Sequence, residues 1–140
     1  MPVSVQARLK TFDKAPSNRI GDYALDANDS AVMSVEFENG ALGVIHASRF
    51  MTGYDNVLKL HVFGDKGAVE LHHGSGWTEI RACSGADVHT QAWRQLVPAS
   101  VESNHRRFVT AIIEGRNAEP SFRRGAELQA FLDECFMTAA

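Results

Sequence analysis

Histidine is the residue type in this chain that most invites a metal-site interpretation, since the 140 residues include six histidines. His46, His61, His72 and His73 could approach one another if neighbouring strands brought them together. A zinc site, however, requires three or four ligands at about 2 Å, and no HxH, HExxH or CxxC pair is present to anchor one. The sequence therefore predicts ordinary strand or surface histidines and no metal site.

Motifs for nucleophilic catalysis and for nucleotide binding are also missing. Serine, histidine and aspartate are plentiful enough for a triad, but no G-x-S-x-G elbow appears, and Gly74-Ser75-Gly76 is typical of a turn. No G-x-G-x-x-G joins a strand to a helix, and no G-x-x-x-x-G-K-[ST] is present. The sequence thus predicts no catalytic residue, no cofactor-binding residue and no bound cofactor in this chain.

A polar stretch between two expected strands, residues 47–56, is the better candidate for binding. It brings Arg49, Tyr54, Asp55 and Asn56 to one end of a sheet, and binding residues often collect on such loops. The alternative is purely structural: Arg49 pairs with Asp55 at the surface and Tyr54 packs on the sheet edge.

The elements that must position this loop are four strands expected between Ala31 and Leu71, forming one antiparallel meander. Asn39-Gly40 favours a two-residue type I′ turn, which would place Phe37 opposite Leu42. Opposed residues share a side, so one face would carry Met33, Val35, Phe37, Leu42 and Val44. The other face would carry a flatter, partly apolar set: Val32, Ser34, Gly43, Ile45 and Ala47, with Glu36, Ala41 and Arg49.

The remaining segments complete an α+β architecture. Residues 3–12 alternate like a half-buried strand, 13–30 read as a loop, and 72–76 should break the sheet before further strands at 78–82 and 91–97. Two helices follow. One spans 102–114 and ends at Gly115; the other carries an apolar stripe over Leu128, Phe131, Leu132, Cys135 and Phe136. We expect an open-faced, mainly antiparallel sheet with the helices on one face.

The uncovered sheet face predicts subunit association. Val32, Ser34, Gly43, Ile45 and Ala47 mix apolar and polar groups in the way that interfaces do. We expect a two-fold homodimer, or a higher homo-oligomer, that buries on the order of 1,200 Å² or more.

Composition restricts the class of protein. The length predicts one domain over residues 1–140, and a net charge of −3 offers no basic stripe for nucleic acid. No apolar stretch approaches the ~20 residues of a membrane span. The two cysteines have neither metal-ligand nor redox-pair spacing, which favours reduced thiols and a cytoplasmic location. No signal peptide is apparent, and a start directly in a strand suggests a cut inside a longer polypeptide.

An ordered set of short motifs resembles a known family. The set is Asp26, Asp29 to Val32, Phe37 to Gly43, Ala47 to Arg49, Gly53 to Asn56 and Phe63 to Gly67. It is similar to the C-terminal domain of the glucose-fructose oxidoreductase, inositol dehydrogenase and MocA family. The final segment, Phe108 to Leu132, is similar to that family's closing helices.

The resemblance implies a role as the substrate-side and oligomerisation domain of an NAD(P)-dependent oxidoreductase of a sugar, cyclitol or polyol. NAD or NADP would be bound in the full-length enzyme, because the family's glycine-rich loop, lysine segment and acid/base histidine segment precede this chain. The chain alone would be inactive. By resemblance, Tyr54 lies near the substrate, with Arg49 and Asp55 beside it. The alternative is a stand-alone, non-catalytic binding or dimerisation module derived from such an enzyme.

Overall fold

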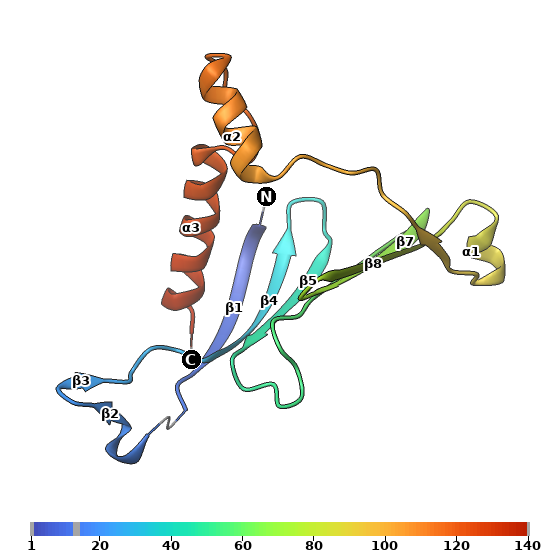
Figure 1. Cartoon of the computed structure of the whole chain (residues 1–140). Helices are drawn as coiled ribbons and strands as arrows, with labels where there is room; N and C mark the ends of the chain where they lie inside the picture. Colours follow the sequence, from blue (N-terminus) through green and yellow to red (C-terminus); the bar gives the residue numbers. More distant parts are fainter. Residues whose placement is uncertain (1, 13–14, 140) are drawn as a thin grey trace. The chain divides into compact units, whose positions relative to one another are not determined.

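The computed structural model describes residues 2–12 and 15–139. Its contacts divide into two compact units, Met1–Phe50 with Ser103–Ala140, and Met51–Glu102 (Figure 1). Residues 13 and 14 of the predicted loop lie outside the described part. That residues 1–140 form a single domain stays a prediction.

The first unit is built on a three-stranded antiparallel sheet in the order β1-β4-β5. Its strands are β1 (Pro2–Lys10), β4 (Ser30–Phe37) and β5 (Leu42–Ser48). The alternating N-terminal segment is therefore a strand, as predicted. It pairs with β4 along most of its length, with Val5 opposite Val35 and Ala7 opposite Met33.

The turn between β4 and β5 differs from the predicted one. Phe37 N donates to Ala41 O (2.9 Å) and Gly40 N donates to Phe37 O (2.8 Å), so the loop holds three residues, 38–40. Of these only Gly40 takes a positive φ, +79°. This is the three-residue hairpin in which a left-handed residue follows a type I turn, and not the two-residue type I′ hairpin.

The extra loop residue shifts the register by one and reverses the face assignment of β5. Val35 lies opposite Gly43 and Met33 opposite Ile45, whereas Val44 lies opposite Ser34. The predicted pairings of Phe37 with Leu42 and of Val35 with Val44 are therefore wrong. A shift of one residue moves every side chain of a strand to the other face. The predicted interface set is split by this correction: Val32 and Ser34 share a face with Leu42 and Val44, while Gly43, Ile45 and Ala47 share the face of Met33.

Helix α3 (Phe122–Met137) covers the Met33 face and closes a small core. Ser121 caps it by accepting a hydrogen bond from Arg124 N (3.2 Å). The residues that α3 and the sheet bury together are Val5, Ala7, Met33, Val35 and Cys135. In Figure 1, α3 runs alongside β1. The predicted stripe faces the sheet at Phe131 and Cys135, but Leu128 and Phe136 remain more than half exposed.

Cys135 is the most buried side chain of this core, at 2% exposure. Burial raises the pKa of the thiol, and the neighbouring Glu134 carboxylate adds to the shift. Both cysteines are buried and free. Because a raised pKa keeps Cys135 neutral, it behaves here as a small hydrophobe.

Helix α2 (Asn104–Ile113) confirms the predicted helix, including the left-handed Gly115 (φ +62°) just beyond its end. Ser103 Oγ caps its start by accepting from Arg106 N (3.3 Å). Its apolar side chains do not lie on the sheet, however. Phe108, Val109, Ile112 and Ile113 are all more than half exposed. The expectation that both helices pack on the sheet is thus correct for α3 alone.

The predicted loop before β4 contains regular structure that the sequence did not reveal. A 3₁₀ turn, η1 (Pro16–Asn18), leads into a two-stranded hairpin of β2 (Arg19–Ile20) and β3 (Tyr23–Ala24). Strands of two residues are too short to show an alternating pattern.

The second unit is a four-stranded antiparallel meander, β6-β7-β8-β9. It comprises β6 (Leu58–Gly64), β7 (Gly67–Gly74), β8 (Trp77–Ser84), the short helix α1 (Asp87–Thr90) and β9 (Arg94–Leu96). The expected single meander from Ala31 to Leu71 is wrong, because its two hairpins belong to two different sheets. His72, His73 and Gly74 continue β7, so the expected break at 72–76 is wrong too, and the turn falls after them.

The two faces of this second sheet differ sharply in chemistry. Register places one set of aliphatic side chains on a common side: Leu58, Leu60, Val62, Val69, Leu71 and Ile80. The other side is polar and carries Lys59, His61, Glu70, His72, Glu79 and Arg81. Leu58, Leu60 and Val62 are more than half exposed, so the aliphatic side is largely uncovered.

Taken together, the elements form an α+β fold with open antiparallel sheets, as the sequence predicts. Among the described helices, none has both the length and the apolarity needed to cross a bilayer.

Candidate functional site

Arg49 is held at the point where β5 ends and the candidate loop begins. Its backbone N donates to Asp29 O (2.9 Å), and the next amide, of Phe50, donates to Ser48 Oγ (3.0 Å). The ring of Phe50 packs against that of Phe12 with centroids 5.0 Å apart. These contacts fix the start of the loop on the first unit.

A hollow of about 360 Å³ lies next to Arg49, at the end of the sheet that α3 covers. Polar groups from the strand ends line one side of it and apolar groups from α3 line the other. The lining includes Asp29, Ser48, Arg49, Met33, Leu132 and Cys135. An apolar wall with a few convergent polar groups is the usual composition of a small-molecule pocket.

Asp29 is the buried polar residue of this region, with 6% of its surface exposed. Its carboxylate Oδ2 accepts from Phe12 N (2.9 Å), its backbone N donates to Lys10 O (2.8 Å), and its backbone O accepts from Arg49 N. One residue therefore ties the end of β1 to the end of β5. Sequence reasoning named Asp29 within a motif but assigned it no role.

Tyr54 and Asp55 belong to the second unit, on the turn before β6. The turn is closed by Tyr54 N donating to Met51 O (3.0 Å), with Gly53 at φ +88°. The Lys59 ammonium lies over the Tyr54 ring, 4.8 Å from its centroid, and 3.5 Å from its hydroxyl. Tyr54 is 57% exposed, so more than half of the residue's surface faces solvent.

Asp55 is anchored on the same unit. Its Oδ2 accepts a hydrogen bond from Ser75 Oγ (2.9 Å), which links the loop to the β7–β8 turn. The structure thus brings Tyr54 and Asp55 together with Lys59 and Ser75, two residues that sequence reasoning missed. Because Arg49 and Asp55 lie in different units, their expected pairing stays a prediction, and so does the substrate-proximal role of Tyr54, Arg49 and Asp55.

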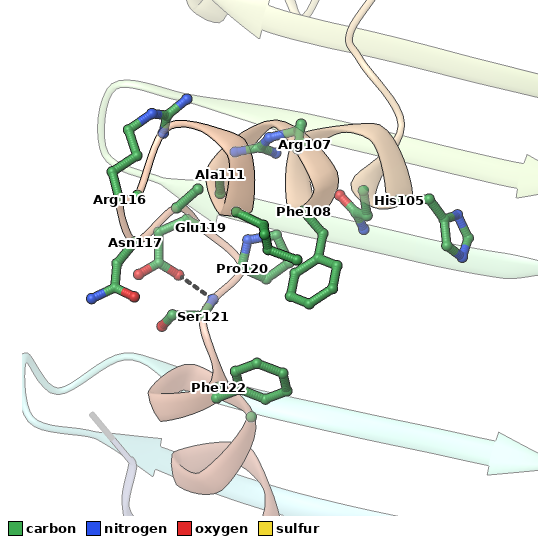
Figure 2. A pocket seen from close by; sticks show the side chains of 15 residues that line it. His105, Arg107, Phe108, Ala111, Arg116, Asn117, Glu119, Pro120, Ser121 and Phe122 are labelled. Carbon is green, nitrogen blue, oxygen red and sulfur yellow. Dashed lines mark hydrogen bonds between the residues drawn. The ribbon is translucent and has the colours of Figure 1, made fainter.

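A larger groove of about 760 Å³ opens between α2 and the start of α3. Figure 2 shows Phe108 from α2 and Phe122 from α3 on its wall, and their rings meet edge to face at 6.1 Å. Glu119 Oε2 accepts from Ser121 N (3.1 Å) at the connecting turn. Phe108 and Phe122 are 52% and 86% exposed, so the groove presents bare aromatic surface.

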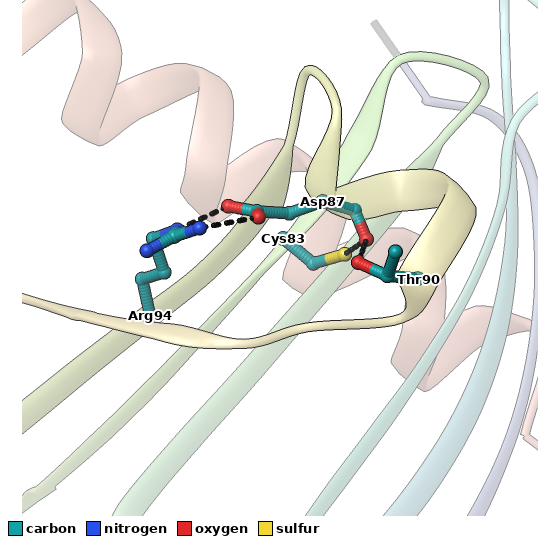
Figure 3. A network of polar contacts seen from close by, with 4 residues as sticks. All are labelled: Cys83, Asp87, Thr90 and Arg94. Atoms are coloured by element: carbon teal, nitrogen blue, oxygen red, sulfur yellow. Dashed lines mark hydrogen bonds and ion pairs between the residues drawn. The ribbon is translucent and has the colours of Figure 1, made fainter.

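A polar network around α1 has a structural explanation. Arg94 donates to both carboxylate oxygens of Asp87, with Nη2 2.6 Å from Oδ1, and the Cys83 thiol donates to the Asp87 backbone O (3.4 Å) (Figure 3). The hydrogen bond from Arg94 lowers the pKa of Asp87 and outweighs the opposing effect of desolvation. The ion pair between Asp87 and Arg94 links α1 to the start of β9.

Metal ligands do not converge in the usual number. Within residues 2–12 and 15–139, no group of three or more His, Cys, Asp or Glu side chains could hold a metal ion. Strand pairing does, however, bring two of the four histidines named above into contact, since His61 Nε2 and His72 Nε2 are 3.0 Å apart.

The fold is that of an α+β domain with an uncovered sheet and an exposed polar turn. A family model described as the GFO/IDH/MocA C-terminal domain matches residues 1–70. The chain belongs to this family. No curated protein sequence matches the chain.

Solved structures share the fold across almost the whole chain. The chain aligns with levoglucosan dehydrogenase in complex with NADH and L-sorbose at 21% identity and a TM-score of 0.74, covering 96% of this chain and 42% of that one. Aldose-aldose oxidoreductase from Caulobacter crescentus, complexed with glycerol, gives 20% identity and 0.75, covering 99% and 39%.

An oxidoreductase domain protein from Kribbella flavida gives 26% identity and a TM-score of 0.73, covering 96% of this chain and 41% of that one. The chain therefore spans less than half the length of the solved structures that it matches.

Proposed function

We propose that this chain is the C-terminal domain of an NAD(P)-dependent oxidoreductase that acts on a sugar, cyclitol or related polyol, and that it supplies a substrate-side wall and a surface for subunit association. The observation that carries the proposal is the family match combined with a fold shared by structures solved with NADH, L-sorbose or glycerol. Two buried, unpaired thiols support a reducing, cytoplasmic location.

The helices of residues 2–12 and 15–139 offer no cradle of the kind that holds a dinucleotide. Helices α2 and α3 begin at serine caps, and neither is entered from a strand through a glycine-rich turn that could hold a pyrophosphate. In this proposal NAD or NADP binds elsewhere in the full-length enzyme. No catalytic proton transfer is assigned to a residue of this chain.

The role left to the chain is recognition of substrate hydroxyls. In the second unit, the Tyr54 hydroxyl, the Lys59 ammonium beside it and the Asp55 carboxylate offer donors and an acceptor on one turn and the strand that follows it. In the first unit, Arg49 lines the hollow at Asp29. Hydroxyl-rich ligands suit such a set because each hydroxyl can both donate and accept.

Uncovered apolar surface supports a larger assembly. The aliphatic side of β6–β8, the α2–α3 groove and the open face of β1-β4-β5 all present apolar groups to solvent. Contiguous patches of this kind usually mark contacts with another domain or subunit. We propose that the open face of β1-β4-β5 forms a homodimer, with Val32, Ser34, Leu42 and Val44 in place of the set predicted from the wrong register.

A stand-alone binding or dimerisation module is the second candidate, favoured by the absence of a dinucleotide cradle in the described residues. The coding sequence upstream of Met1 separates the two. A strand, a glycine-rich loop and a lysine segment in frame support the oxidoreductase, and a stop codon supports the module.

In the enzyme that carries this domain, Tyr54→Phe is expected to lower kcat/KM for the polyol by roughly two- to thirteen-fold. The change removes one hydroxyl bond to substrate, worth about 0.5–1.5 kcal/mol. Steady-state rates of NAD(P)H formation measure it. Tyr23→Phe, at a tyrosine on β3 that is still more exposed (78% against 57%), is the control and should leave the rates unchanged. Equal kinetics for Tyr54→Phe and the unmodified enzyme would return Tyr54 to a packing role.

A further inference from the structure

Two histidines on neighbouring strands of the second sheet point their Nε2 atoms at each other. His61 lies on β6 and His72 on β7, on the polar side of the sheet, and the two Nε2 atoms are 3.0 Å apart. The ring centroids are 5.3 Å apart, with 34° between the ring planes. This is hydrogen-bonding distance, at which the Nε2–H of one ring can donate to the Nε2 of the other, in an order that depends on the tautomers.

When both rings carry their proton on Nδ1, both Nε2 atoms offer a lone pair and can bind one metal ion. Imidazole nitrogens bind Zn²⁺ at about 2.0–2.1 Å, and at that length a 3.0 Å separation gives an N–metal–N angle of about 94°. An angle near 90° belongs to tetragonal or octahedral ions, whereas a tetrahedral ion needs the nitrogens to part by about 0.3 Å. We propose that His61 and His72 form a bidentate site for a divalent transition-metal ion, with Cu²⁺ and Ni²⁺ preferred over Zn²⁺.

The surrounding side chains fit a two-nitrogen site completed by water. Glu70 lies directly opposite His61, but Arg81 Nη2 holds its carboxylate at 2.5 Å. Glu79 lies opposite His72, with Arg81 Nε 3.8 Å from it. These carboxylates stay in the outer shell, consistent with the absence of a three-ligand group among the described residues.

A cation and an aromatic ring also neighbour the histidine pair. Lys59 is opposite His72, but its ammonium lies over the Tyr54 ring, 4.8 Å from the centroid. Phe63 meets His61 edge on, with centroids 6.2 Å apart. An ion bound here joins β6 to β7 and so stabilises that hairpin.

Titration of the untagged 140-residue chain with Cu²⁺ tests the site. Calorimetry should give one ion per chain, and the electron paramagnetic resonance spectrum should show two coordinated nitrogens. His61→Gln and His72→Gln should each weaken binding about tenfold or more, since a chelating pair becomes a single imidazole. His73→Gln is the matched control, because His73 lies on the opposite side of β7 and bonds to Thr78 Oγ1 (2.7 Å). It should bind Cu²⁺ as the unmodified chain does.

A second measurement needs no variant. Substoichiometric Cu²⁺ should broaden the imidazole NMR signals of His61 and His72 before those of His46, His73, His89 and His105. The proposal is overturned if all six histidines broaden together, or if a folded His61→Gln chain keeps the affinity of the unmodified one.

Discussion

Replacing Val44 with lysine is expected to convert a dimer of this chain into monomers. Val44 and Leu42 are 78% and 83% exposed on the open face of β5, and Val32 adds a third apolar group beside them. Arg8, Glu36 and Gln6 supply a polar border on the neighbouring strands. A two-fold contact through this face buries Val44 of both copies, so lysine there places a charge from each subunit in a desolvated patch. Light scattering at tens of micromolar measures the change.

The matched control is the next residue of the same strand. Ile45 pairs with Met33, so it lies on the other face of the sheet from Val44. Ile45→Lys should therefore leave the association intact, and circular dichroism checks that this variant is folded. Monomers from Ile45→Lys together with dimers from Val44→Lys would place the interface on the other face. A monomeric unmodified chain would remove the interface altogether.

The second large effect is expected at Asp29, where Asp29→Ala should lower the free energy of unfolding by about 1–3 kcal/mol. The change leaves the part-buried Phe12 amide without the carboxylate that it donates to, and an unsatisfied buried donor costs an amount of this order. The midpoint of urea denaturation, at an unchanged slope, measures the loss.

Asp29→Asn tests the cause of that loss. An asparagine side-chain oxygen can still accept from Phe12 N, so this variant should lose clearly less stability than Asp29→Ala. Equal losses in both variants would show that the negative charge, and not the hydrogen bond, holds the strand ends together. A loss below about 0.5 kcal/mol in Asp29→Ala, the range of an ordinary surface change, would contradict the role.

Hydrophobic periodicity predicted most elements of the fold. The alternation of β1 and β4, and the spacing of apolar residues in α2 and α3, locate these elements within a few residues of their observed bounds. Within one element, the spacing of apolar residues is determined by which side chains are buried. The hydrophobic pattern of a single element does not show which other strand that element pairs with. The contact of β1 with β4, and the separation of β5 from β6, depend on the packing of distant segments.

The register of the β4–β5 hairpin was predicted wrongly because the sequence of its turn fits two loop lengths. Asn39-Gly40 fits a two-residue type I′ turn and also a three-residue loop whose last residue is a left-handed glycine. Both use Gly40 at positive φ, but Asn39 takes a positive φ only in the two-residue turn, and Glu38 belongs to the loop only in the three-residue one. One residue of difference exchanged the faces of Gly43, Val44, Ile45 and Ala47.

The candidate site was predicted in its residue types but not in its partners. Arg49, Tyr54 and Asp55 are neighbours in sequence, which suggested one cluster, yet the structure pairs Tyr54 with Lys59 and Asp55 with Ser75. The contact between His61 and His72 arises because they occupy diagonal positions across a hairpin, and a search for sequential ligand motifs does not find it. Asp29 was missed because the amino-acid sequence does not show by itself that this carboxylate is buried.

The central claim is that this domain supplies a substrate wall and an association surface but no dinucleotide site. Calorimetric titration of NADH into the 140-residue chain tests this claim most directly. The account predicts no saturable binding tighter than about 100 μM, a free energy of roughly 5 to 6 kcal/mol. Saturable binding of NADH with a Kd below about 100 μM would contradict this claim.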